Sequence, residues 1–147
     1  MAQRGSEVHL MREILFKAKR VDNGEWVEGS LLQTTAVSLK SFIVPSASYT
    51  FGQWDWLEMA EVDSDTICQY TRSTDKNGNK IWENDIVEIP SEDEYFKLEW
   101  QEDTARFVMS SDSFIVDFDN YWSYEIEVIG NIFDHKELLE SEEQHGK

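Results

Sequence analysis

Two short acidic pairs are the parts of the sequence whose residue types and spacing come nearest to a chemical site. Asp63 with Asp65, and Asp117 with Asp119, place carboxylates at alternate positions, which point the same way on a strand. Hard divalent cations prefer such oxygen ligands. Neither pair continues into the glycine and distal glutamate of an EF-hand loop, so no dedicated metal site is predicted. Asp117 and Asp119 support one hypothesis, a divalent-ion-dependent hydrolase.

Histidine and cysteine offer even less chemistry. His9, His135 and His145 are scattered along the chain, and none stands at metal-ligand spacing from another. Cys68 is the single cysteine, which excludes an intramolecular disulfide and every zinc or iron–sulfur pattern built on several cysteines. It has no neighbouring base in sequence, so a packed thiol is favoured over a nucleophile. The glycines are too far apart for a phosphate loop. The sequence therefore predicts no catalytic residue and no cofactor.

Large aromatic side chains gather in two segments that carry loop-type residues. Their members are Trp54, Trp56, Tyr121, Trp122 and Tyr124, flanked by Gly, Asp or Asn. Most rings of this kind belong to a core or cover one, but exposed Trp and Tyr also anchor protein interfaces. We therefore expect these five residues to form a possible interface, and the chain to be a homo-oligomer.

The net charge of −17 is unevenly distributed. Residues 83–147 hold 19 acidic and 4 basic residues, a balance of −15, whereas residues 1–82 hold 11 and 9, a balance of −2. Affinity for nucleic acid comes chiefly from Lys and Arg on phosphates, so direct binding is not expected. Acidity usually serves solubility. A second hypothesis remains, in which the acidic half imitates nucleic acid and occupies a basic protein.

Length and composition indicate one globular domain. The chain has 147 residues, of which 40% are apolar, enough to build a core. No apolar run approaches the roughly 20 residues that cross a bilayer, and no signal peptide is recognisable. We expect no membrane association and a reducing bacterial cytoplasm. Residues 1–10 are predicted to be a disordered extension, residues 11–140 one β-rich domain, and residues 141–147 a flexible tail.

Period-two alternation of apolar residues recurs along most of the chain. The first two predicted strands form a hairpin around Asn23-Gly24, a pair that supplies positive φ angles. A second such pair is Asn77-Gly78. Residues 133–140 carry the pattern of a capped helix, with Asp134 as N-cap. The prediction is an all-β, mainly antiparallel fold with small barrel elements and a short C-terminal helix. Its strands are 13–21, 26–32, 41–44, 66–71, 85–89, 104–109, 113–118 and 125–128, with a long loop between the third and the fourth.

Three stretches together resemble the YopX-like family of phage and prophage proteins. They are residues 11–19 with 23–30, residues 65–71 with 75–87, and residues 127–134. The family's central motif reads aromatic-Glu-Gly-Asp-Ile-Val, and here it is Trp-Glu-Asn-Asp-Ile-Val over residues 82–87. Asn84 thus replaces a glycine, and Asn tolerates the left-handed backbone better than other residues with a side chain.

The resemblance implies a β-rich fold, partly SH3-like around the Asp-Ile-Val strand, in a protein encoded by a bacteriophage. It implies no catalytic residues. The leading hypothesis is therefore a non-enzymatic accessory protein that presents a surface to itself or to another protein.

Overall fold

The computed structural model describes residues 13–35, 37–45, 59–92, 94–118 and 125–139, and it divides into two compact units. Unit 1 is Met1–Arg72 and unit 2 is Ser73–Lys147. The predicted extension at residues 1–10 and the predicted tail at 141–147 lie outside the described residues. The single domain over residues 11–140 stays a prediction. Within the described part, no helix is both long enough and apolar enough to span a membrane.

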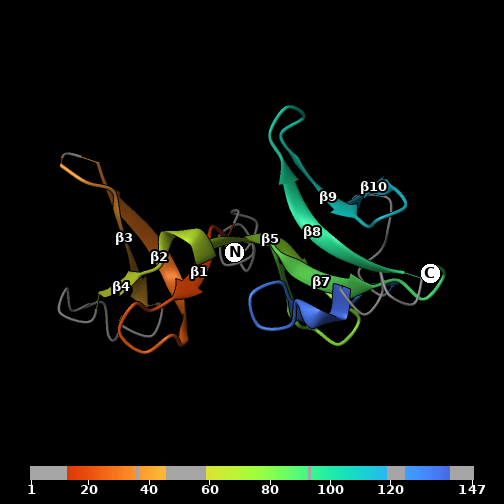
Figure 1. Cartoon of the computed structure of the whole chain (residues 1–147), viewed down its shortest axis with the longest axis horizontal. Helices are drawn as coiled ribbons and strands as arrows, with labels where there is room; N and C mark the ends of the chain where they lie inside the picture. Colours follow the sequence, from red (N-terminus) through yellow and green to blue (C-terminus); the bar gives the residue numbers. More distant parts are fainter. Residues whose placement is uncertain (1–12, 36, 46–58, 93, 119–124, 140–147) are drawn as a thin grey trace, which may run out of the picture. The chain divides into compact units, whose positions relative to one another are not determined.

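Unit 1 is an antiparallel sheet (Figure 1). Its strands lie in the order β4-β3-β2-β1-β5, and a 3-10 turn, η3 (Ser64–Thr66), follows β4. The strand bounds are β1 Phe16–Lys19, β2 Trp26–Thr34, β3 Lys40–Pro45, β4 Ala60–Val62 and β5 Cys68–Thr74. One face carries the core, because alternate residues of these strands point to the same side. That core is formed by Ala18, Ile43 and Val62, with Phe16, Val27, Leu31 and Ile67 packed against it.

The turn between β1 and β2 differs from the prediction in its backbone. Gly24 alone has a positive φ of 76°, whereas Asn23 does not. The strands close where Arg20 N–H donates to the Glu25 carbonyl, and Gly24 N–H donates to the Arg20 carbonyl, both at 2.9 Å. Asn23 contributes through its side chain, which accepts the Glu25 N–H. The hairpin is therefore confirmed, but its loop holds four residues and needs only one left-handed position.

Unit 2 is a second antiparallel sheet, in the order β10-β9-β8-β7-β11. Its strands are β7 Asp85–Glu88, β8 Tyr95–Gln101, β9 Arg106–Ser110, β10 Ile115–Asp117 and β11 Glu127–Asn131. The short β6 (Lys80–Trp82) precedes them and is hydrogen-bonded to β5, the strand in which the chain passes from unit 1 to unit 2. The core of this unit is larger. Its buried members are Ile81, Val87, Ile89, Phe96, Leu98, Met109 and Ile126.

The mainly antiparallel β class is confirmed, and several predicted boundaries are wrong. Three strands were not predicted: β4 and β6, which have three residues each, and β8. The first strand begins at Phe16, and Ile14, expected on its buried face, is 62% exposed. A short C-terminal helix is present, with residues 137–139 in helical conformation. The turn before it is organised by Asn131, whose side chain accepts the N–H groups of Phe133 and Asp134.

Candidate interaction surfaces

The turn that contains Asn77-Gly78 is built around a buried carboxylate. Asp75 is only 3% exposed, and one of its oxygens accepts the backbone N–H groups of Asn77 and Asn79 at 2.9 Å. Its other oxygen accepts the N–H of Val128 at 2.9 Å, 53 residues further on. Burial alone raises the pKa of Asp75, but these backbone N–H bonds outweigh it and hold the pKa below the ordinary value. Asp75 therefore ties the turn to β11.

The turn between β6 and β7 is fixed in a similar way. Asn84 has a φ of +72°, so the left-handed position expected where the family has glycine is confirmed. Its N–H donates to the carbonyl of Leu98 at 2.7 Å, and its carbonyl accepts the N–H of Ile132 at 3.0 Å. The buried carboxylate of Asp85 accepts the Trp82 N–H at 2.8 Å. This motif joins β8 to the segment after β11.

His135 has a packing role at the end of β11. Its Nδ1 accepts the N–H of Asn131 at 3.2 Å, and its own N–H donates to the Asn131 carbonyl. The ring lies so close to Gly130 that a Cβ added there would be 2.8 Å from it. Glycine is required at this position by close approach rather than by φ. Asp75, Asn84 and His135 thus serve turns and strand contacts.

The remaining candidate residues either form other contacts or lie outside the described residues. The Cys68 thiol is buried and donates to the Thr66 carbonyl at 3.3 Å. Asp117 lies on β10 and pairs with Arg106 at 3.0 Å, while Asp119 lies outside the described residues, as do His9 and His145. Within the described ranges, no three His, Cys, Asp or Glu side chains come together in a way that could hold a metal ion.

All five aromatic residues expected at an interface lie outside the described residues. These are Trp54, Trp56, Tyr121, Trp122 and Tyr124. The structure therefore brings none of them into a site, and their part in an interface stays a prediction.

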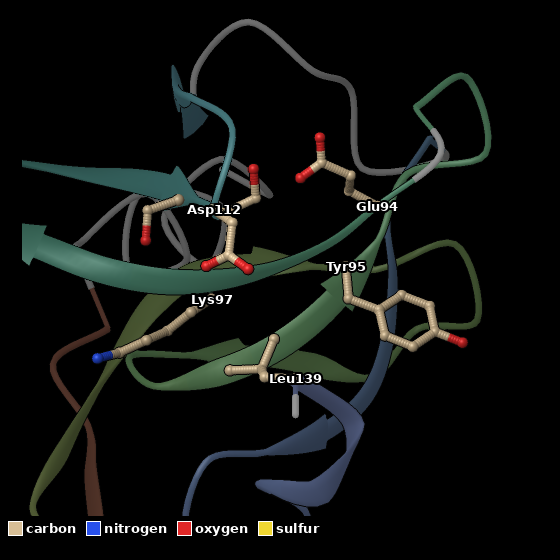
Figure 2. Close-up of a pocket in the computed structure, with 7 residues that line it drawn as sticks. Glu94, Tyr95, Lys97, Asp112 and Leu139 are labelled. Atoms are coloured by element: carbon tan, nitrogen blue, oxygen red, sulfur yellow. The ribbon is translucent and has the colours of Figure 1, made fainter. Parts of the chain in front are cut away.

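A hollow lies on unit 2, beside β8 and β9 (Figure 2). It has a volume of about 180 Å³ and is lined by Glu94, Tyr95, Lys97, Ser110, Ser111, Asp112 and Leu139. Hydrogen bonds from the hydroxyls of Ser111 and Ser113 lower the pKa of Glu94. In Figure 2 the Lys97 ammonium points away from the Glu94 carboxylate. The hollow therefore holds charged and hydroxyl side chains, among which Glu94 accepts hydrogen bonds from the two serines.

Exposed apolar side chains lie on hairpins of both units, and Ile14 and Val21 are also exposed beside β1. The β2–β3 hairpin carries Leu32, Val37 and Leu39, of which Val37 is 98% exposed. In Figure 1 its end extends past β1 and β4. Unit 2 exposes Trp100 near the end of the β8–β9 hairpin, and Phe114 and Ile115 around the start of β10.

Sequence reasoning missed the β2–β3 hairpin as a candidate surface, although the signal was present. Leu32, Val37 and Leu39 lie in a stretch without charge that runs from residue 29 to residue 39. A solvent-facing loop usually carries polar and charged residues, so apolar residues there indicate a contact surface.

The described residues define a small all-β protein whose motif side chains fix turns and whose apolar surface lies on hairpins. The chain matches the model of the family described as YopX protein over residues 15–140, so it belongs to the YopX family. This confirms the resemblance. None of the curated proteins compared with the chain matches it.

Proposed function

We propose that this protein is a non-enzymatic accessory protein of phages or prophages, which acts in the cytoplasm of a bacterial host as a self-associating protein-interaction module. The observation that carries the proposal is how its polar and apolar side chains are used. Asp75, Asn84 and His135 belong to turns or to strand packing, whereas the hairpins leave Leu39 and Val37 in solvent. Exposed apolar patches are typical of interaction sites in soluble proteins.

Light scattering coupled to size-exclusion chromatography tests this proposal. At micromolar concentration we expect a mass that is a multiple of the 17.2 kDa chain and that falls on dilution. The five aromatic candidates, Trp54, Trp56, Tyr121, Trp122 and Tyr124, can be replaced by Ser in two groups to find whether they contribute. A strict monomer across the concentration range would contradict the proposal.

A second function is supported by charge, namely that the protein is an acidic decoy for a basic, nucleic-acid-binding protein. Unit 2 holds 20 acidic and 6 basic residues, a balance of −14. Such a contact would weaken steeply with salt, because exposed charges are screened over about 10 Å at 0.1 M ionic strength. Immobilised protein should then retain basic host proteins at low salt and release them near 0.5 M. Retention of no basic protein would contradict this function.

Of the two residues on which the hydrolase hypothesis rests, only Asp117 lies within the described residues. Asp117 is held by Arg106, an ion pair that a bound cation would have to displace. Titration calorimetry with Mg²⁺ and Mn²⁺ on the protein and on the Asp117→Ala, Asp119→Ala double variant tests the idea. Equal affinity in both proteins would exclude these residues as ligands.

A further inference from the structure

We propose that the β2–β3 hairpin is the surface on which a second copy of this chain docks, through antiparallel pairing of the two β2 edges over Ser30–Thr34. This inference rests on the proposed self-association and names the surface responsible for it. Three observations lead to it: the low charge of the hairpin, the edge of β2 along which no described strand lies, and the charges at the two ends of the hairpin.

The hairpin is the least charged part of a highly charged chain. Between Glu28 and Asp55 the only ionisable Asp, Glu, Lys or Arg is Lys40. Two copies that each carry −17 repel one another wherever their acidic surfaces meet. Contact through an uncharged hairpin keeps those surfaces apart, and the remaining repulsion is screened over about 10 Å.

Among the described strands, only β3 pairs with the outer half of β2. β1 pairs with β2 only from Trp26, which lies opposite Lys19, to Gly29, which lies opposite Phe16. β3 pairs with β2 as far as Thr34. Among the described strands, none lies along the other edge of Ser30–Thr34. Natural proteins protect such edges with charges, proline or bulges, and an unprotected edge is a template for another strand. Here it also carries the exposed side chain of Leu32.

The charges at the ends of the hairpin favour an antiparallel arrangement. Glu28 stands at its base and Lys40 at its tip, and the register places both on the same face, which is opposite to the core. Both are exposed, and neither forms an ion pair within the described part of the chain. Antiparallel pairing of two β2 strands puts Glu28 of one copy at the tip of the other, near its Lys40. Parallel pairing would put like charges together.

The first experiment measures the dissociation constant of the oligomer by sedimentation equilibrium. Leu39→Glu and Leu32→Glu place a charge at the paired hairpins, so we expect each to weaken association by roughly 100-fold. Ile115→Glu in unit 2 is the matched control, since Ile115 is 59% exposed and Leu39 is 58% exposed. It should change the constant by less than about twofold. Circular dichroism verifies that every variant is folded, and Val37→Glu provides a fully solvent-exposed alternative.

The second experiment tests the direction of pairing. Lys40→Glu should weaken association by roughly threefold to tenfold, and adding Glu28→Lys should restore it, because the two charges are exchanged. In a Cys68→Ala background, single cysteines placed one at a time along Ser30–Thr34 should form a disulfide-linked dimer for the residue at the twofold axis.

The outcomes separate this inference from the function it depends on. A wild-type oligomer whose dissociation constant is unchanged by Leu32→Glu and Leu39→Glu would overturn the hairpin surface and leave self-association standing. A wild-type monomer would overturn both. Failure of Glu28→Lys to restore Lys40→Glu, with no disulfide-linked dimer at any position, would overturn the antiparallel pairing.

Discussion

Unit 1 and unit 2 are built on the same kind of sheet but carry very different charge. Residues 1–72 hold 10 acidic and 7 basic residues, a balance of −3, whereas residues 73–147 hold 20 and 6, a balance of −14. Each still has its own buried apolar cluster, and the more acidic unit has the larger one. Net charge therefore does not decide whether the sheet folds. It decides which surfaces can meet another acidic molecule.

The hairpins of the two units show the same contrast at smaller scale. The β8–β9 hairpin has Glu99, Glu102, Asp103 and Arg106 around its end, and its Trp100 packs edge to face on Phe107 with ring centroids 5.1 Å apart. The β2–β3 hairpin has no charge from residue 29 to residue 39. Charges at a strand end discourage pairing with another chain. The β8–β9 hairpin is thus protected by charge against pairing with another chain, whereas the β2–β3 hairpin is not.

The largest expected effect on stability comes from replacing Asp75, the buried carboxylate of unit 2. Asp75→Ala leaves the N–H groups of Asn77, Asn79 and Val128 without their acceptor. Two of these donors lie on exposed residues that water can reach, but each hydrogen bond to the charged carboxylate contributes about 1.5–3 kcal/mol, so we expect a loss of about 4 kcal/mol in the free energy of unfolding, confined to unit 2. Urea unfolding gives the size, and hydrogen exchange of peptides from residues 73–147 gives the location.

Asp75→Asn is the conservative control for that change. An amide offers one acceptor oxygen where the carboxylate offers two, so part of the stability should return. Equal loss of protection in peptides from residues 13–35 would show that the two units do not unfold separately and would break the comparison.

Unit 1 has its own sensitive position at the base of its hairpin. Gly29 faces Pro45 in the β2–β3 register, and a Cβ there would lie 1.9 Å from the Val44 carbonyl oxygen. Gly29→Ala must push the strands apart, and we expect a loss of about 3 kcal/mol in unit 1. Gly24→Ala is the control, because its Cβ has open space and only the positive φ is unfavourable, at about 1 kcal/mol. A smaller loss for Gly29→Ala than for Gly24→Ala would refute the close approach.

The fold could be predicted from the sequence where its signals are local. Asn84 stands where a left-handed residue is required, and the hairpin around Gly24 follows from turn chemistry. β8 was not predicted, although Phe96 and Leu98 alternate with the charged Lys97 and Glu99 in the period-two pattern of a strand. β4 and β6 have three residues each, too few to show a period.

The role of Asp75 could not be predicted, because it depends on a partner distant in sequence. Among 30 acidic residues nothing local distinguishes a carboxylate that will accept the N–H of Val128. The same holds for His135, whose metal-ligand chemistry was considered but whose ring packs on Gly130. That β3 alone among the described strands pairs with the outer half of β2 is likewise a property of strand pairing, and only the missing charge in that segment is visible in the sequence.

The stability of unit 2 should also depend on pH through Asp75. The pKa of this carboxyl in the folded state lies below that of the unfolded chain, which is about 3.9 for Asp. The stabilisation is therefore complete above the unfolded pKa and is lost as pH falls through the folded pKa. The effect should be smaller than that of Asp75→Ala, because a protonated carboxyl keeps acceptor oxygens. Urea unfolding between pH 7 and pH 3 measures it, and a pH dependence unchanged in Asp75→Asn would contradict this assignment.

The smallest expected effect, a change in association, comes from removing charge from the β8–β9 hairpin so that it resembles the uncharged β2–β3 hairpin. Glu102→Ser with Asp103→Ser removes two exposed charges from the end of the β8–β9 hairpin, and it frees the Trp100 indole N–H that donates to Glu102 at 2.8 Å. If charge is what keeps this hairpin from pairing, association should tighten by roughly threefold, the size expected of exposed charges at the rim of a contact. Adding Leu39→Glu then separates the two surfaces. Association that survives in the combined variant runs through β8–β9, whereas its complete loss leaves β2–β3 as the surface on which the copies meet.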